Sequence, residues 1–183
     1  MRIVKENRYV RITAFFLGIV TANLIGRELF VTYGILNTYF IRQYVETVPD
    51  LNRLWFHVLG IRIKWAGLVL VLFHFFRAEH VLLFLECALA YTFGILQVAA
   101  ILNLGWKGLV VVILGMLPQW ICYLITIVLY YELKCRQRQM GDRMEQRVVM
   151  VLCYSIVFVL FLVGIWAEVA VNPVLMQKVL KKF

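Results

Sequence analysis

The chain has 183 residues, of which 63% are hydrophobic and 16% are charged, and its mean hydropathy is +0.86. A typical soluble domain is about 45–50% apolar and about 25% charged, so this composition excludes an ordinary soluble protein and predicts an integral membrane protein. The net charge of +9 does not indicate a nucleic-acid-binding protein, because the basic residues cluster at the ends of apolar runs, where they set orientation and meet anionic lipid head groups.

Five apolar runs are the predicted membrane crossings, at residues 9–26, 63–76, 81–102, 107–131 and 148–171. A spanning helix needs about 20 mostly apolar residues, so the second run is short for a crossing. The first run also has the positive start of a cleaved signal peptide, but no clear small-x-small cleavage site ends it. We therefore expect one domain over residues 1–183. It is predicted to be an all-α polytopic membrane helix bundle in a lipid bilayer, with about five transmembrane helices plus interfacial amphipathic helices.

The density of Lys and Arg in the loops predicts the orientation of the chain. Four basic residues lie within residues 1–11 and five within residues 132–147, against five across the longer stretch 27–64. Because the denser basic segments stay in the cytoplasm, the amino terminus is expected there and the carboxyl terminus outside.

The long segment 27–62, between the first two crossings, is then extracytoplasmic. In its first part an apolar residue recurs every three or four positions, which is typical of an amphipathic helix on the outer leaflet or against the bundle. These residues, which are candidates for docking a partner, are Leu29, Tyr33, Leu36, Phe40 and Tyr44. Pro49-Asp50 ends this helix, and a second amphipathic piece from Leu51 leads back into the second crossing.

The fifth crossing ends in a short polar turn. Glu168 lies 20 residues after Val148, which is about 30 Å along a helix and places it at the outer boundary of the hydrocarbon, where a carboxylate costs little. Asn172 precedes a proline and is expected to avoid helical geometry. It would cap a new helix with Pro173 in its first turn, so that the tail 172–183 lies along the outer face.

Residues able to carry enzymatic chemistry are scattered. Glu86 is expected to pack or to reach Arg77, and its spacing from His74 and His80 does not suit a metal site. Ser155 has no base at a fixed spacing, and the four cysteines are predicted to be small apolar packing residues. We expect no catalytic, cofactor-binding or metal-binding residues, and the chain is predicted not to be an enzyme.

Small residues at helical spacing predict close helix packing. They are Gly18, Ala22 and Gly26 in the first crossing and Ala90 and Gly94 in the third. Contact within this chain is expected, with a partner's helix as the alternative. Pro118, beside Gly115, is expected to kink the fourth crossing and to free a backbone carbonyl, which Gln119 could satisfy.

Two stretches carry a resemblance to a known family. One is Glu168-Val169-Ala170-Val171-Asn172-Pro173-Val174-Leu175, and the other is Gly115-Met116-Leu117-Pro118 in the fourth crossing. They resemble motifs of the stage II sporulation protein M family, which has a glutamate before Thr/Asn-Pro and an aliphatic pair, and a glycine–aliphatic–Leu-Pro. That family usually continues with His-Gly and an acidic residue, where this chain has Gln119, Trp120 and Tyr123. The chain thus resembles a divergent member.

The resemblance implies a non-enzymatic scaffold in the cell membrane of a spore-forming bacterium. In that family the protein helps to recruit peptidoglycan-degrading partners during engulfment of the forespore. The implied partners are cell-wall hydrolases or other membrane proteins, and homo-oligomers are also compatible. The alternative is a small permease or the membrane subunit of a transporter, which is motivated by Pro118, Gln97, Gln119, Asn103 and Glu86.

Overall fold

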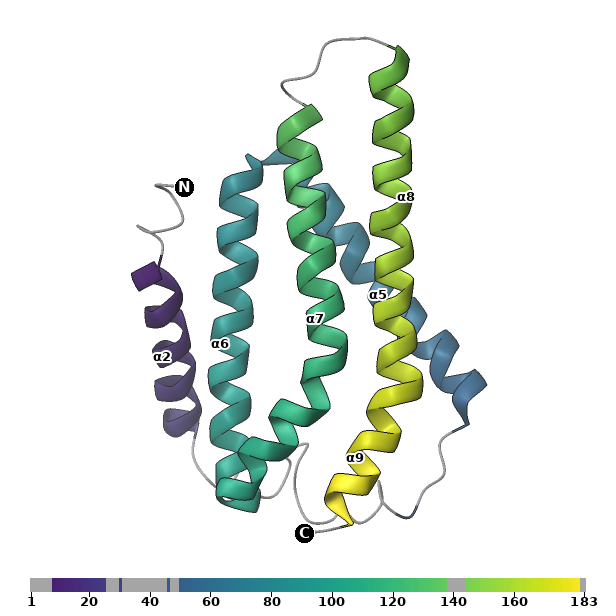
Figure 1. The fold of residues 1–183 in the computed structure, drawn as a ribbon. Helices are drawn as coiled ribbons and strands as arrows, with labels where there is room; N and C mark the ends of the chain where they lie inside the picture. Colours follow the sequence, from purple (N-terminus) through teal and green to yellow (C-terminus); the bar gives the residue numbers. More distant parts are fainter. Residues whose placement is uncertain (1–7, 26–29, 31–45, 47–49, 138–143, 182–183) are drawn as a thin grey trace. The chain divides into compact units, whose positions relative to one another are not determined.

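A computed structural model describes residues 8–25, 30, 46, 50–137 and 144–181, and Figure 1 traces their helices. The helices are α2 (Arg8–Ile25), α5 (Leu51–Phe75), α6 (Ala78–Leu104), α7 (Trp106–Gln137), α8 (Met144–Trp166) and α9 (Asn172–Leu180), with a π-helical segment η1 (Ala167–Val171) between the last two. The described residues form no strand. The prediction of an all-α chain is confirmed.

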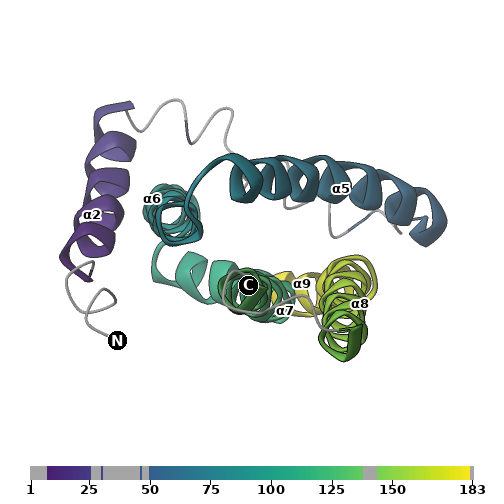
Figure 2. The ribbon, with the colours of Figure 1, turned by 90° about the horizontal axis from the view of Figure 1, so that it is seen from above.

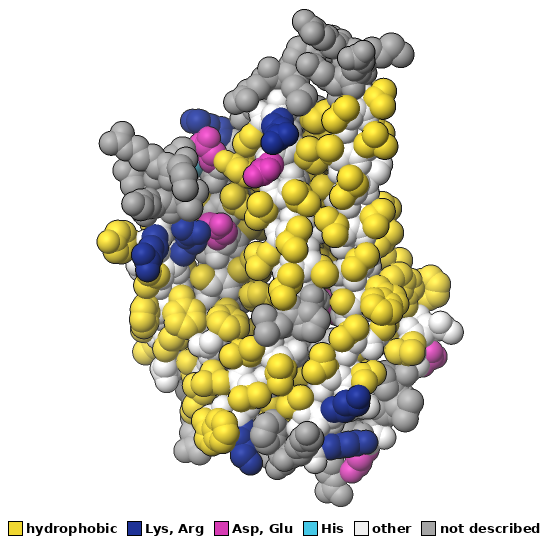
Figure 3. All heavy atoms as spheres, viewed as in Figure 1, with side chains coloured by type: hydrophobic (Ala, Val, Ile, Leu, Met, Phe, Trp, Pro, Cys, Tyr) yellow, Lys and Arg dark blue, Asp and Glu magenta, His cyan; other side chains and the backbone are white. Residues whose placement is uncertain are grey.

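Four stretches are long and apolar enough to cross a membrane, namely α2, α5, α6 and the continuous helix Val148–Leu180. A fifth span arises if the two halves of α7, Trp106–Met116 and Gln119–Gln137, are taken together as one bent helix. Apolar side chains predominate on the visible surface of α8 and along much of α7 (Figure 3), as expected for helices that face lipid. The prediction of a polytopic membrane bundle is confirmed.

The second span begins earlier than the apolar run that predicted it. Asp50 caps α5, because its Oδ1 accepts hydrogen bonds from the backbone N–H groups of Asn52 at 3.1 Å and Arg53 at 3.4 Å. Residues 51–62, which we expected in the outer segment, therefore continue into the span without a break. Leu29, Tyr33, Leu36, Phe40 and Tyr44 lie outside the described residues.

The chain does not turn at the Asn-Pro pair. Asn172 has helical angles (φ −61°, ψ −48°), so the prediction that it avoids helical geometry is wrong. Its N–H donates to the Ala167 carbonyl, five residues earlier, in the wider π-helical turn. Local π adjustments of this kind let membrane helices contain proline. The predicted cap is wrong as well, because Asn172 Oδ1 is buried and has no hydrogen-bond partner.

The chain divides into two compact units. Unit 1 comprises residues 1–48, 83–115 and 175–183, and unit 2 comprises residues 49–82 and 116–174. In unit 1, α2 packs closely against α6, because a Cβ on Gly18 would overlap the Tyr91 backbone and one on Gly94 would overlap the Phe15 backbone. Gly105 has φ 63°, a left-handed conformation that suits glycine and ends α6.

Unit 2 contains α5, the second half of α7, α8 and η1. Viewed from above, α8 is seen almost end-on while α5 extends across the picture, so α5 is strongly inclined to α8 (Figure 2). Rings lie between the helices: Phe73 of α5 is 5.1 Å from Tyr130 of α7, and Tyr130 is 5.9 Å from Tyr154 of α8. Gly164 lets α8 approach the Tyr123 ring.

Candidate functional site

Three helical segments of unit 2 bring a charged cluster together: Arg62 from α5, Tyr123 from α7 and Glu168 from η1. Arg62 Nε donates to Glu168 Oε2 at 2.8 Å, and its Nη2 donates to Oε1. Tyr123 Oη donates to the same Oε2 at 2.7 Å. The guanidinium thus holds both carboxylate oxygens, the two-point geometry that gives an arginine–carboxylate pair its strength and specificity.

The cluster is largely shielded, with 15% of the Glu168 side chain and 33% of the Arg62 side chain exposed. The Arg62 guanidinium also lies 5.2 Å from the centre of the Tyr123 ring, within the range of a cation–π contact. Charged groups inside membrane spans are costly unless they are paired and are therefore candidates for function. Here the arginine and the glutamate compensate each other, and the tyrosine occupies a further lone pair of the carboxylate.

The main partner of Glu168 was not predicted from the sequence. We expected a carboxylate at the outer boundary, whereas the structure pairs it with an arginine 106 residues away. A signal was present, because Arg62 precedes the second crossing and Glu168 closes the fifth, so the predicted topology puts both at the same membrane face. Tyr123 had been noted only as a departure from a family motif.

Two further polar side chains of unit 2 lie close to this cluster along the chain. Gln119 is 6% exposed, and its Oε1 is buried without a hydrogen-bond partner. Asn172 Oδ1 is buried and unpartnered as well. Among the described residues, no hydrogen bond joins Gln119 to the carbonyl that we expected it to satisfy. The side chains of Leu117 and Pro118 lie outside those described.

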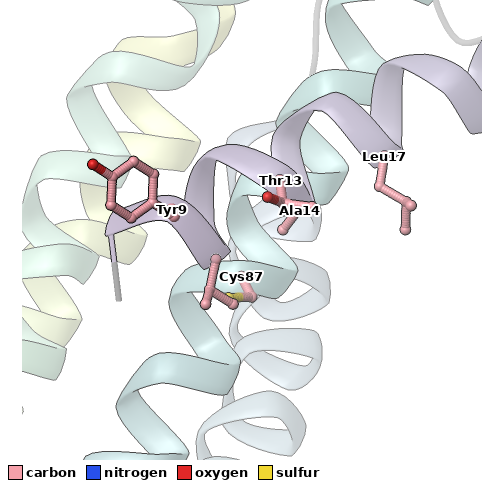
Figure 4. A pocket seen from close by; sticks show the side chains of 6 residues that line it. Tyr9, Thr13, Ala14, Leu17 and Cys87 are labelled. Carbon is pink, nitrogen blue, oxygen red and sulfur yellow. The ribbon is translucent and has the colours of Figure 1, made fainter. Parts of the chain in front are cut away.

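Unit 1 holds a second ion pair and a shallow hollow. Arg11 Nη1 lies 3.2 Å from Glu86 Oε2, so the expected contact between Glu86 and Arg77 is wrong. Arg77 instead lies 3.7 Å from Glu79, in unit 2. Beside the first pair, α2 and α6 border an open, mostly apolar hollow of about 410 Å³ (Figure 4). Its lining residues are Tyr9, Val10, Thr13, Ala14, Leu17 and Cys87.

The small residues predicted to pack helices are found partly in contact. Gly18 and Gly94 are buried where α2 and α6 meet, and Ala22 is buried as well. Ala90 is half-buried, and Gly26 lies outside the described residues. Gly115 of the family motif is buried against the Met176 thioether in unit 1. These glycines act through the close approach that they permit.

The described residues contain no group of three or more His, Cys, Asp or Glu side chains that could hold a metal ion. Compared with known proteins, the chain matches no family model, no curated protein and no solved structure.

Proposed function

We propose that the chain is a non-enzymatic membrane scaffold, of the kind implied by its resemblance to the stage II sporulation protein M family. One observation carries the proposal: the glutamate of the carboxyl-terminal motif, Glu168, is held on both oxygens by Arg62 and on one also by Tyr123. Glu168 of η1 thus links α5 and α7 through its hydrogen bonds.

A carboxylate used in this way is poorly suited to catalysis. A general acid or base must come within hydrogen-bond reach of a substrate proton, directly or through one water. Glu168 accepts three hydrogen bonds from its own chain, and only 15% of its side chain is exposed. In the proposed scaffold, the cluster of Arg62, Tyr123 and Glu168 holds the helices of unit 2 together, so that other surfaces of the chain can bind partners.

The proposed partners are peptidoglycan-degrading proteins at the outer face of a bacterial cell membrane. The proposed orientation places the amino terminus in the cytoplasm and the carboxyl terminus outside, with self-association of the scaffold also compatible. The surfaces available for docking would be the part of the outer segment that precedes α5, residues 27–50, and the tail 172–183. On that tail, the described side chains of Val174 and Lys178 are exposed.

The test is co-purification from detergent with candidate cell-wall hydrolases. Wild-type protein is expected to retain them, and deletion of residues 28–46 or 172–183 is expected to weaken retention. A matched control is Ser155→Ala, because Ser155 is exposed on α8 and hydrogen-bonds only within its own helix, to the Val151 carbonyl at 2.9 Å. Undiminished retention of every partner after both deletions would contradict the proposal.

A permease remains the second candidate because polar groups lie in helices long and apolar enough to span, notably Glu168, Arg62 and Gln119, whose Oε1 has no hydrogen-bond partner. Two residues that motivated this alternative are already engaged. Asn103 Nδ2 donates to the Phe30 carbonyl at 3.1 Å and to the Ala99 carbonyl at 2.9 Å, and Glu86 pairs with Arg11. Substrate flux into liposomes that contain only this protein would favour the permease over the scaffold.

A further inference from the structure

The open hollow of unit 1 lies along the first half of α2, a helix long and apolar enough to span a membrane. Most of its lining residues recur at the spacing of one helix face, and Cys87 of α6 adjoins them (Figure 4). The α2 residues are Tyr9, Val10, Thr13, Ala14 and Leu17. The 18 residues of α2 extend about 27 Å, slightly less than the hydrocarbon thickness of about 30 Å, so the first turn lies near the lipid head groups. From Tyr9 to Leu17 the hollow follows about 12 Å of helix, most of the depth of one leaflet.

An incompletely satisfied ion pair borders this hollow. Arg11 Nη1 donates to Glu86 Oε2 at 3.2 Å, and the charges of both residues interact with the thiol of Cys87, which lines the hollow. About a third of each side chain is exposed, 31% for Arg11 and 32% for Glu86. Within the part of the chain that the structure describes, Glu86 accepts no second hydrogen bond. It therefore retains a free carboxylate oxygen, unlike Glu168, which accepts three hydrogen bonds.

A hydroxyl group in the same hollow also has no partner. The other serine and threonine side chains that the structure describes donate to a backbone carbonyl four residues earlier. These residues are Thr21, Thr92, Thr126 and Ser155. Thr13 is exposed and makes no such bond to any described residue. Its hydroxyl is therefore able to donate to an oxygen of a molecule that occupies the hollow.

These features match the parts of a phospholipid. The apolar lining suits an acyl chain, and the Thr13 hydroxyl can donate to an ester carbonyl of the glycerol region. At the ion pair, Arg11 can donate to the lipid phosphate, and the free oxygen of Glu86 can accept from an ammonium group. The pair is neutral as a whole, so it suits a head group with one negative and one positive charge. A purely anionic head group would face the Glu86 carboxylate unfavourably, and a quaternary ammonium has no N–H to donate to it.

We infer that the hollow between α2 and α6 binds one phospholipid whose head group carries a primary ammonium, as in phosphatidylethanolamine. The ammonium lies at Glu86, the phosphate at Arg11, and an acyl chain follows α2 toward Leu17. The inference goes beyond the proposed scaffold and does not depend on it, because a scaffold and a permease would lie in the same bilayer.

The experiment uses the full chain in phosphatidylcholine nanodiscs that contain a trace of phosphatidylethanolamine with a photoreactive diazirine in one acyl chain. Mass spectrometry after illumination identifies the cross-linked residues. Cross-links are expected to concentrate on residues 9–17 and around Cys87. Replacing part of the phosphatidylcholine by unlabelled phosphatidylethanolamine should suppress them, whereas the same amount of phosphatidylglycerol should not. Cross-links spread evenly over all spans, or equal suppression by the two lipids, would overturn the inference.

A charge variant ties the lipid preference to the ion pair. Glu86→Gln removes the acceptor for the ammonium and leaves the charge of Arg11 uncompensated by Glu86, so the preference should reverse and phosphatidylglycerol should become the better competitor. Glu79→Gln is the matched control, because Glu79 is similarly exposed (37% of its side chain) and pairs with Arg77 in unit 2. It should keep the wild-type preference. An unchanged preference in Glu86→Gln would overturn the inference.

A hydroxyl variant decides the question if Glu86→Gln does not fold. Thr13→Val removes the hydroxyl at nearly constant volume from an exposed position, and it should reduce cross-linking in the hollow several-fold. Thr21→Val is its matched control on the same helix, because the Thr21 hydroxyl already donates to the Leu17 carbonyl at 2.8 Å. Equal cross-linking of the two threonine variants would overturn the inference.

Discussion

At the scale of the residue, the Glu168 carboxylate accepts three side-chain hydrogen bonds. Its partners come from two other helices, so its contribution to stability depends on groups far away in the sequence. The Arg77–Glu79 pair offers a contrast within unit 2, because its oppositely charged atoms are 3.7 Å apart and 70% of the arginine side chain is exposed. The two arginines should therefore respond very differently to removal.

Replacing Arg62→Met is expected to lower the free energy of unfolding by about 3 kcal/mol, because it leaves a shielded carboxylate with Tyr123 as its one remaining partner. Arg77→Met is the control and is expected to cost at most about 1 kcal/mol, as for an exposed ion pair. Chemical denaturation in detergent, followed by tryptophan fluorescence, measures both variants. Equal losses of unfolding free energy in the two variants would show that the Arg62–Glu168 pair stabilises the protein no more than the exposed Arg77–Glu79 pair does.

Replacing both members of the pair tests whether they act together. Glu168→Gln removes the charge, keeps one oxygen acceptor and replaces the other oxygen by an NH2 group of similar volume, so we expect it to cost less than Arg62→Met. The double variant Arg62→Met with Glu168→Gln is expected to be more stable than the sum of the single losses predicts, by about 1–3 kcal/mol. The same denaturation measurement gives this coupling energy. If the loss in the double variant equalled the sum of the two single losses, Arg62 and Glu168 would not stabilise the protein as a pair.

At the scale of the element, glycines in different helices have different consequences. A Cβ on Gly94 of α6 would overlap the Phe15 carbonyl, whereas a Cβ on Gly67 of α5 would meet no atom within 4 Å. Gly94→Ala should therefore lower the free energy of unfolding by about 1–3 kcal/mol through overpacking. Gly67→Ala, the matched control, should be neutral or raise it by up to about 1 kcal/mol, because alanine favours a helix more than glycine does. Thermal unfolding of both variants provides the comparison. If Gly67→Ala were destabilised and Gly94→Ala unaffected, Gly94 would not be the glycine that close helix packing requires.

Hydropathy predicted the existence and type of the helices because an apolar run is a property of consecutive residues. The run 81–102 lies inside α6, and the small residues Gly18 and Gly94 mark the interface that α2 and α6 form. The pairing of Arg62 with Glu168 was not predicted, because it depends on how helices distant in the sequence pack. The helical Asn172 was missed because a π-helical turn overrides the usual effect of the following proline.

At the scale of the whole molecule, the number of crossings depends on α7. Four helices are long and apolar enough to span, and α7 adds a fifth if its halves Trp106–Met116 and Gln119–Gln137 form one crossing. If α7 enters and leaves on the same side instead, the segment 138–143 and the carboxyl terminus both change sides. The concentration of basic residues in 132–147 favours a complete crossing, because it keeps that loop in the cytoplasm.

Labelling of single cysteines in intact cells separates these topologies. In a chain whose four cysteines are replaced by serine or alanine, we expect Lys181→Cys to react with a membrane-impermeant maleimide from outside. Lys5→Cys and Arg138→Cys should react only after the membrane is permeabilised, because five crossings leave both in the cytoplasm. If Lys5 and Lys181 report the same compartment while Arg138 reports the other, then α7 is re-entrant and the chain crosses four times. The tail would then face the cytoplasm, where it could not dock cell-wall enzymes.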